Sequence, residues 1–73
     1  MAAELRFFTR QGCHLCDDAL ELLGGVRLEI IDIDLDPELL LLYDERVPVL
    51  LDTGTGEVLL EGVFTPQAVR SFR

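Results

Sequence analysis

The feature that most constrains this chain is a short apolar segment that passes abruptly into a helical pattern. Residues Glu4–Thr9 read ELRFFT, which is apolar, rich in aromatics and typical of a buried strand. Gln11-Gly12 interrupts this segment. From His14 to Leu23 one helix face is then apolar, formed by Leu15, Ala19, Leu22 and Leu23. The chain is therefore expected to begin with a strand, a turn and a helix.

The middle of the chain repeats this alternation. Gly24-Gly25 is a typical helix end. Val26–Leu35 then alternates apolar and charged residues as a strand does, with a slip in phase at Ile30-Ile31 that predicts a bulge. Asp36-Pro37-Glu38 is a helix start, with a capping Asp, a proline at the first helical position and an acid at the positive end of the dipole. We expect this helix to reach about Glu45.

The last third predicts a hairpin and a final helix. Val47–Asp52 and Glu57–Glu61 are short strand candidates around a glycine-rich turn, and Thr65-Pro66 caps a helix expected to end at Arg73. The element order is β-α-β-α-β-β-α, and a right-handed crossover makes the first two strands parallel. The predicted fold class is therefore α/β, with a four-stranded mixed sheet and helices on both faces.

Length and composition fit one globular domain over residues 1–73. Hydrophobic residues make up 49% of the chain, which argues against disorder. The net charge of −8, with six arginines and no lysine, argues against nucleic acid and against anionic membranes as partners. We expect most of the carboxylates to serve solubility, and a basic protein partner is the sharper alternative.

A cytosolic location is expected. Glu4, Arg6 and Arg10 interrupt the start of the chain, so it does not resemble a secretory leader. No apolar run approaches the ~20 residues of a membrane span. In a reducing compartment two cysteines are seldom a structural staple and are more often catalytic or metal-binding.

Cys13 and Cys16 lie where the first strand hands over to the first helix. Unpaired N–H groups and the positive end of the helix dipole favour a thiolate at such a position. We therefore expect Cys13 to be the exposed nucleophile and Cys16, one turn further on, to be the resolving thiol. Attack by Cys13 on a disulfide would give a mixed disulfide that Cys16 releases.

The charged neighbours of Cys13 act in opposite directions. His14 is expected either to support the thiolate or to be a solvated histidine with a modest effect, and Arg10 to add positive potential. Asp17 and Asp18 repel a nearby thiolate and raise its pKa. The sequence therefore predicts moderate acidity for Cys13.

A metal site is the main alternative chemistry for these residues. Cys13, His14 and Cys16 are the only strong candidate ligands in the sequence, and a closed structural zinc site needs four. We therefore expect no metal in the isolated chain. A site completed by a second chain stays open.

The arrangement resembles the glutaredoxins and thioredoxins over essentially the whole chain. The residues that carry the resemblance are Cys13-His14-Leu15-Cys16 at a helix start, the distant Arg46-Val47-Pro48-Val49-Leu50, and Gly62 after the fourth strand. Within that superfamily, with its thioredoxin-like fold, the chain looks most like the short glutaredoxin-like proteins whose motif reads GCHLC.

The resemblance implies a cis peptide at Val47-Pro48 facing the disulfide, where the Val47 backbone pairs with an extended substrate. Two departures concern glutathione. Arg46 replaces the threonine before Val-Pro and is a candidate for the glycyl carboxylate. Arg10 is the candidate substitute for a lysine before the CxxC, and a single Gly62, followed by Val63, replaces a Gly-Gly pair. Use of glutathione as a co-substrate stays open on the sequence.

Three functions are compatible with the sequence. The leading prediction is a monomeric thiol–disulfide oxidoreductase without a bound cofactor. It would reduce protein or small-molecule disulfides and be reset by glutathione or a thioredoxin-reductase-type protein. Its substrate-contacting residues are expected to be Arg10, His14, Arg46, Val47, Pro48 and Gly62. The alternatives are a metal or iron–sulfur dimer bridged by Cys13 and a thioredoxin-like binding module without turnover.

Overall fold

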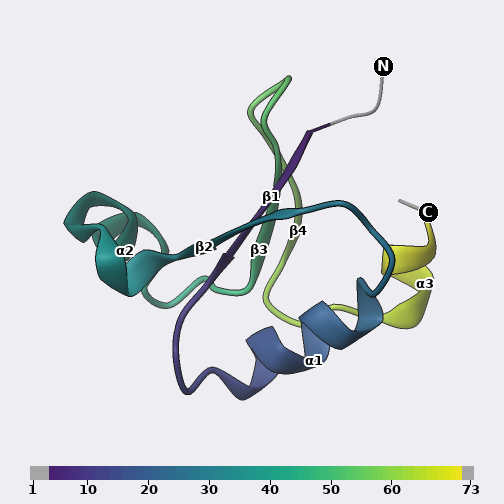
Figure 1. Ribbon diagram of the computed structural model, residues 1–73, viewed down its shortest axis with the longest axis horizontal. Helices are drawn as coiled ribbons and strands as arrows, with labels where there is room; N and C mark the ends of the chain where they lie inside the picture. The colour runs from purple at the N-terminus through teal and green to yellow at the C-terminus, as the bar shows by residue number, and fades with distance from the viewer. Residues whose placement is uncertain (1–3, 72–73) are drawn as a thin grey trace.

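The computed structural model describes residues 4–71 (Figure 1). The elements in chain order are β1 (Leu5–Thr9), α1 (His14–Leu22), β2 (Glu29–Asp32), the 3₁₀ turn η1 (Ile33–Leu35), α2 (Pro37–Tyr43), β3 (Val49–Asp52), β4 (Glu57–Glu61) and α3 (Pro66–Arg70). The four strands form one sheet in the order β2-β1-β3-β4. The predicted order of elements and the α/β class are confirmed.

The strand directions bring distant segments to one end of the sheet. β1 runs parallel to β2 and antiparallel to β3, and β3 is antiparallel to β4. In register, Thr9 lies opposite Asp32, Phe8 opposite Val49, and Val49 opposite Glu61. β1, β2 and β4 therefore end at the edge where β3 begins. We call this end of the sheet, bounded by Thr9, Asp32, Val49 and Glu61, the cysteine edge.

Two consecutive phenylalanines of β1 anchor a core on each face of the sheet, because successive side chains of a strand point to opposite faces. Phe7 packs with Ala19 of α1 and Val69 of α3, and meets Phe64 edge-to-face at 5.9 Å between ring centroids. Phe8 packs with Ile33 of η1 and stacks on Tyr43 of α2 at 4.5 Å. Helices therefore cover both faces, as the sequence predicts.

The second strand is shorter than the alternation over residues 26–35 predicts. Only Glu29–Asp32 pair with β1, and Ile33–Leu35 turn into η1. The Asp32 side chain ends the strand by accepting a hydrogen bond from the Asp34 N–H at 2.9 Å. The bulge predicted at Ile30-Ile31 is wrong as well, since these residues pair regularly. The irregularity lies between Leu50 and Leu51, where β3 meets β4.

Helix α1 buries a different stripe from the predicted one. Leu15 is 44% exposed, whereas Cys16, Ala19 and Leu23 are buried at i, i+3 and i+7. Leu22 is only partly buried against the core. The buried face is thus shifted by one residue at the start of the helix. This shift takes the second cysteine into the core.

Several predicted boundaries are corrected. Helix α2 ends at Tyr43, with Asp44 as its C-cap, and not at Glu45. Strand β3 begins at Val49 and not at Val47. Helix α3 ends at Arg70 with Ser71 as its C-cap, and the remainder of the predicted helix, residues 72–73, lies outside the described residues. Within residues 4–71, none of the helices is long and apolar enough to cross a membrane.

Core and surface leucines should differ sharply in their effect on stability. Leu50 of β3 is 0% exposed and Leu41 of α2 is 86% exposed. Leu50→Ala leaves a cavity and is expected to lower the free energy of unfolding by about 2–5 kcal/mol, a large part of the ~5–15 kcal/mol typical of a domain. Leu41→Ala should change it by less than about 0.5 kcal/mol. Urea denaturation of both oxidised variants measures this, and equal losses would contradict the assigned core.

Candidate active site

Cys13 is the N-cap of α1. Its backbone is extended (φ −88°, ψ 103°), and its Sγ accepts a hydrogen bond from the Cys16 N–H at 3.1 Å. Its carbonyl accepts the first bond of the helix, from the Asp17 N–H at 3.2 Å. An N-cap side chain takes up one of the N–H groups that a helix start leaves unpaired. In the reduced protein this hydrogen bond would stabilise negative charge on Cys13 Sγ, which is what the position of the motif predicts.

The two cysteines form a disulfide and differ in access. Their Cα atoms are 5.2 Å apart, within the usual range for a disulfide. Cys16 is 0% exposed, whereas Cys13 is partly exposed. A target from solution can therefore approach Cys13, while Cys16 can reach Cys13 only from the protein side. The predicted catalytic roles of the two residues fit this asymmetry.

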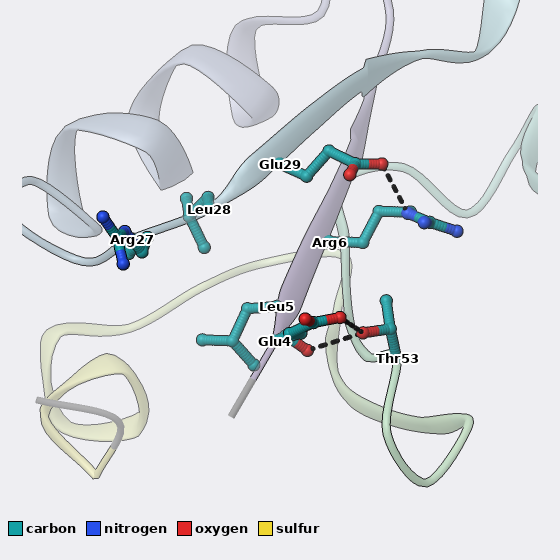
Figure 2. Close-up of a pocket in the computed structure, with 7 residues that line it drawn as sticks. All are labelled: Glu4, Leu5, Arg6, Arg27, Leu28, Glu29 and Thr53. Carbon is teal, nitrogen blue, oxygen red and sulfur yellow. Dashed lines mark hydrogen bonds and ion pairs between the residues drawn. The ribbon is translucent and has the colours of Figure 1, made fainter. Parts of the chain in front are cut away.

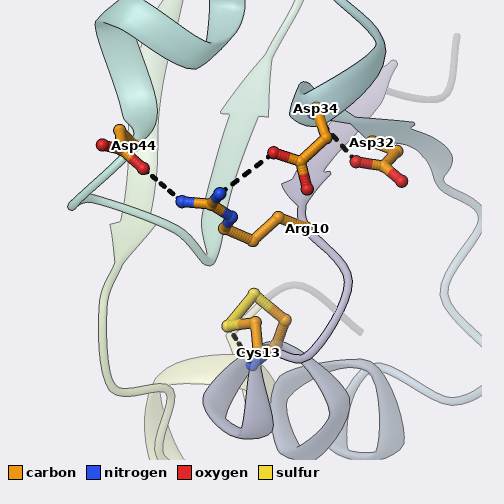
Figure 3. Close-up of polar contacts among 6 residues, drawn as sticks. Arg10, Cys13, Asp32, Asp34 and Asp44 are labelled. Carbon is orange, nitrogen blue, oxygen red and sulfur yellow. Dashed lines mark hydrogen bonds and ion pairs between the residues drawn. A yellow bond between two sulfur atoms is a disulfide. The ribbon is translucent and has the colours of Figure 1, made fainter.

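Arg10 lies beside the disulfide but points to carboxylates (Figure 3). One guanidinium nitrogen is 3.0 Å from Asp34 Oδ1, and another donates to Asp44 Oδ1. The positive potential expected from Arg10 is thus offset by two acids. Sequence reasoning did not connect Asp34 and Asp44 with the site. The parallel pairing of β1 and β2 is the signal that places η1, with Asp34, beside the residues that follow β1.

His14 lies on the outer side of α1. Its side chain is 88% exposed, and its Nε2 is 3.4 Å from Asp18 Oδ2, one turn along the helix. The sequence left open whether His14 supports the Cys13 thiolate or is a solvated histidine, and its position in the structure fits the solvated histidine. Its predicted contact with substrate stays a prediction.

The loop before β3 contains the expected cis peptide. Val47-Pro48 is cis, and Pro48 is buried. The Gly62 N–H donates to the Pro48 carbonyl at 2.8 Å, with Gly62 at φ +78°, a conformation that glycine adopts without strain. Two predicted substrate contacts, Pro48 and Gly62, thus lie together at the cysteine edge. The Val47 N–H donates to the Tyr43 carbonyl at 3.1 Å, so a substrate strand would compete with that bond.

Arg46 is held by an acid from β4. Its Nε and Nη2 donate to the two carboxylate oxygens of Glu61, both at 3.0 Å, and its guanidinium lies 5.1 Å from the centroid of the Tyr43 ring. The hydrogen bond from Arg46 lowers the pKa of Glu61, and the same bond raises the pKa of Arg46. The side chain predicted to meet a glutathione carboxylate therefore already binds a carboxylate of its own chain.

Residues 4–71 contain no group of three or more His, Cys, Asp and Glu side chains placed to hold one ion. A metal bound at Cys13 would therefore need ligands from another molecule.

The sheet order, the cysteine pair at the start of α1 and the cis-proline before β3 define a protein of thioredoxin-like fold with a CxxC pair. Residues 4–70 match the family described as "Glutaredoxin-like domain (DUF836)". The chain belongs to this glutaredoxin-like family. This confirms the resemblance and the fold expected from the sequence.

Two solved structures are similar to this chain. The structural-genomics target protein XcR50 from X. campestris, determined by X-ray crystallography, has a TM-score of 0.82 and 35% identity, covering 93% of this chain and 92% of its own. Protein Ne2328 from Nitrosomonas europaea, determined by solution NMR, has a TM-score of 0.78 and 28% identity, covering 99% and 92%. Comparison with curated proteins finds no match.

The difference in access between the cysteines can be measured by alkylation. After reduction, limiting iodoacetamide should label Cys13 first, because Cys13 is partly exposed and Cys16 is buried. Peptide mapping by mass spectrometry reads the position of the label. In Cys13→Ser, the remaining Cys16 should react slowly in buffer and fast in urea. Equal labelling of both cysteines in the folded protein would contradict the assigned asymmetry.

The Arg46–Glu61 pair predicts a pH dependence of defined sign. Because Arg46 lowers the pKa of Glu61, the pair stabilises the fold above the ordinary Glu pKa of about 4.3. This contribution is lost as the pH falls through the lower folded value. NMR titration of the side-chain carboxyl carbons should show the Glu61 midpoint rising toward its ordinary value in Arg46→Gln. An unchanged midpoint would show that the pair does not persist in solution.

Proposed function

We propose that this protein is a dithiol–disulfide oxidoreductase whose redox centre is Cys13 and Cys16. The observation that carries the proposal is the position of Cys13. Cys13 is partly exposed and its Sγ accepts a helix N–H at 3.1 Å, while its partner Cys16 is buried. A thiolate stabilised at a helix start is a nucleophile, and a second thiol within bonding distance limits the lifetime of a mixed disulfide. Membership of the glutaredoxin-like family supports thiol redox chemistry.

The cycle uses both cysteines and balances two electrons. The Cys13 thiolate attacks one sulfur of a target disulfide, so that a mixed disulfide forms and the other target sulfur leaves as a thiolate, which takes a proton. Cys16 then loses its proton and attacks Cys13 Sγ, forming the Cys13–Cys16 disulfide. The second target sulfur leaves as a thiol. The target is reduced by two electrons and the protein is oxidised by two.

Resetting the protein needs an external reductant. Two equivalents of a small cellular thiol, or a thioredoxin-reductase-type protein, would return Cys13 and Cys16 to the dithiol. No bound cofactor takes part in this cycle. A reducing compartment such as the cytosol suits it.

The loop before β3 and the turn after β4 are the proposed docking surface for the target. Pro48 and Gly62 are joined by a hydrogen bond of 2.8 Å at the cysteine edge, next to Val47. An extended peptide placed here could use the backbone of Val47 in the manner of strand addition. His14, exposed at the start of α1 next to Cys13, is available for a further contact.

The test is equilibration of the protein with a neutral monothiol couple, 2-mercaptoethanol and hydroxyethyl disulfide, at graded ratios of the reduced and oxidised forms. Intact mass should show a reversible loss of two hydrogens. A midpoint within the broad range of cellular thiol systems, about −120 to −320 mV, is expected. Failure to form a reversible disulfide at any ratio would overturn the proposed function and favour a binding module.

Single-cysteine variants assign the two roles within the same experiment. With the neutral hydroxyethyl disulfide as target, Cys16→Ser should stop at one stable mixed disulfide per chain, because the resolving thiol is missing. Cys13→Ser should show at least a large fall in reaction rate, since its only thiol is buried. A Cys13→Ser protein that reduces disulfides at the wild-type rate would remove Cys13 from the mechanism.

A further inference from the structure

We propose that ion pairs within the cysteine edge make the redox centre discriminate against anionic thiols and disulfides such as glutathione. Glu61 holds Arg46, and Asp34 together with Asp44 holds Arg10, so both of these arginines at the cysteine edge already bind carboxylates of the chain itself. This inference rests on the proposed oxidoreductase function. It names the charge class of substrate that this centre takes.

Both arginines belong to the cysteine edge. Arg10 follows β1 directly and precedes Cys13 by three residues, and Figure 3 shows it between Asp34 and Asp44 next to the disulfide. Arg46 precedes Pro48 by two residues, and Glu61 lies opposite Val49 in the sheet register. A substrate bound at Cys13 and along the loop before β3 therefore approaches the two arginines and their acids together.

The pairing geometry leaves little capacity for a further anion. Arg46 makes two parallel hydrogen bonds of 3.0 Å to Glu61, the bidentate arrangement in which arginine binds carboxylates most strongly. Arg10 bridges two acids from different elements, Asp34 of η1 and Asp44 at the end of α2. An incoming carboxylate must displace an acid that is tethered to the same chain and therefore present at high effective concentration.

The charge balance acts in the same direction. Two arginines face three carboxylates in these pairs, so their sum is one negative charge. The whole chain carries a net charge of −8. Glutathione has two carboxylates and one ammonium, so it approaches with a net negative charge, and at the described part of the cysteine edge both Arg10 and Arg46 are already paired. Neutral and cationic disulfides do not meet this barrier, and Cys13 itself remains partly exposed to them.

A third ion pair provides a matched control (Figure 2). Arg6 and Glu29 are joined at 2.9 Å with exposed side chains, much as Arg46 and Glu61 are at 3.0 Å. This pair belongs to an open pocket of about 410 Å³ at the other end of the sheet. Arg6 lies in β1, four residues before Arg10, which corresponds to about 13 Å at the rise of a strand. Glu29→Gln thus changes the net charge by the same amount as Glu61→Gln, but at a position away from the cysteine edge.

The experiment compares three small disulfides that differ in charge: anionic glutathione disulfide, neutral hydroxyethyl disulfide and cationic cystamine. Rates of reduction by the reduced protein are measured by stopped flow for wild type, Glu61→Gln, Asp34→Asn/Asp44→Asn and Glu29→Gln. The ratio of the rate with glutathione disulfide to the rate with hydroxyethyl disulfide is the readout. Comparing this ratio between variants cancels both the intrinsic reactivity of each disulfide and any change in the Cys13 nucleophile.

Glu61→Gln and the double variant should each raise this ratio by roughly two- to fivefold, the range that corresponds to exposed ion pairs. They should lower the corresponding ratio for cystamine. Glu29→Gln should leave both ratios unchanged. In wild type, the ratio for glutathione disulfide should rise with salt, because the Debye length falls from about 10 Å at 0.1 M to about 3 Å at 1 M.

Two results would overturn the proposal. One is an unchanged glutathione ratio in both Glu61→Gln and the double variant, with circular dichroism showing that both are folded. The other is an equal rise in Glu29→Gln, which would assign the effect to net charge and not to the paired arginines. Absence of reduction of the neutral disulfide by wild type is a different result, because it would refute the oxidoreductase function itself.

Discussion

The structure depends on one strand being covered on both faces. Phe7 and Phe8 are adjacent in β1, and each is the centre of a separate core. Phe7 fixes α1 and α3 on one face, and Phe8 fixes η1 and α2 on the other. A domain of this size can bury only a small apolar surface. Its helices are accordingly short, five to nine residues each, and they pack on both faces of the single strand β1. Because β1 lies between parallel β2 and antiparallel β3, the same packing gathers the loops of four elements beside Cys13.

The difference between the two cysteines follows from how α1 docks. The face with Cys16, Ala19 and Leu23 enters the Phe7 core, while Cys13 stays outside as the N-cap. A helix rotated toward Leu15, the stripe suggested by the leucine pattern alone, would leave Cys16 nearer the surface. Core packing at Ala19 and Leu23 therefore separates the accessible sulfur from the protected one.

Local signals carried most of the prediction from sequence. Glycines, prolines and capping residues gave the element order, and the CxxC with the distant Val47-Pro48 gave the family and the cis peptide. What the sequence left undetermined depends on tertiary contacts. Residues 33–35 could continue the strand or form a turn, and the bond from the Asp34 N–H to the side chain of Asp32, the last residue of β2, favours the turn. Arg10 meets Asp34 and Asp44 across separations of 24 and 34 residues, which no local pattern reports.

Two opposing requirements act on the charge near Cys13: support for its thiolate, and no attraction for anionic thiols. A free cation beside Cys13 would stabilise its thiolate, but its field would also attract every anionic thiol in solution. The N–H of Cys16 supports the sulfur from 3.1 Å, and the influence of a helix terminus fades within about one turn. With Arg10 and Arg46 neutralised by acids of the same chain, Cys13, the proposed nucleophile, would keep short-range support without a long-range attraction for anions. Under the proposed oxidoreductase function, the acids at this edge would therefore set the charge class of the substrate as well as serve solubility.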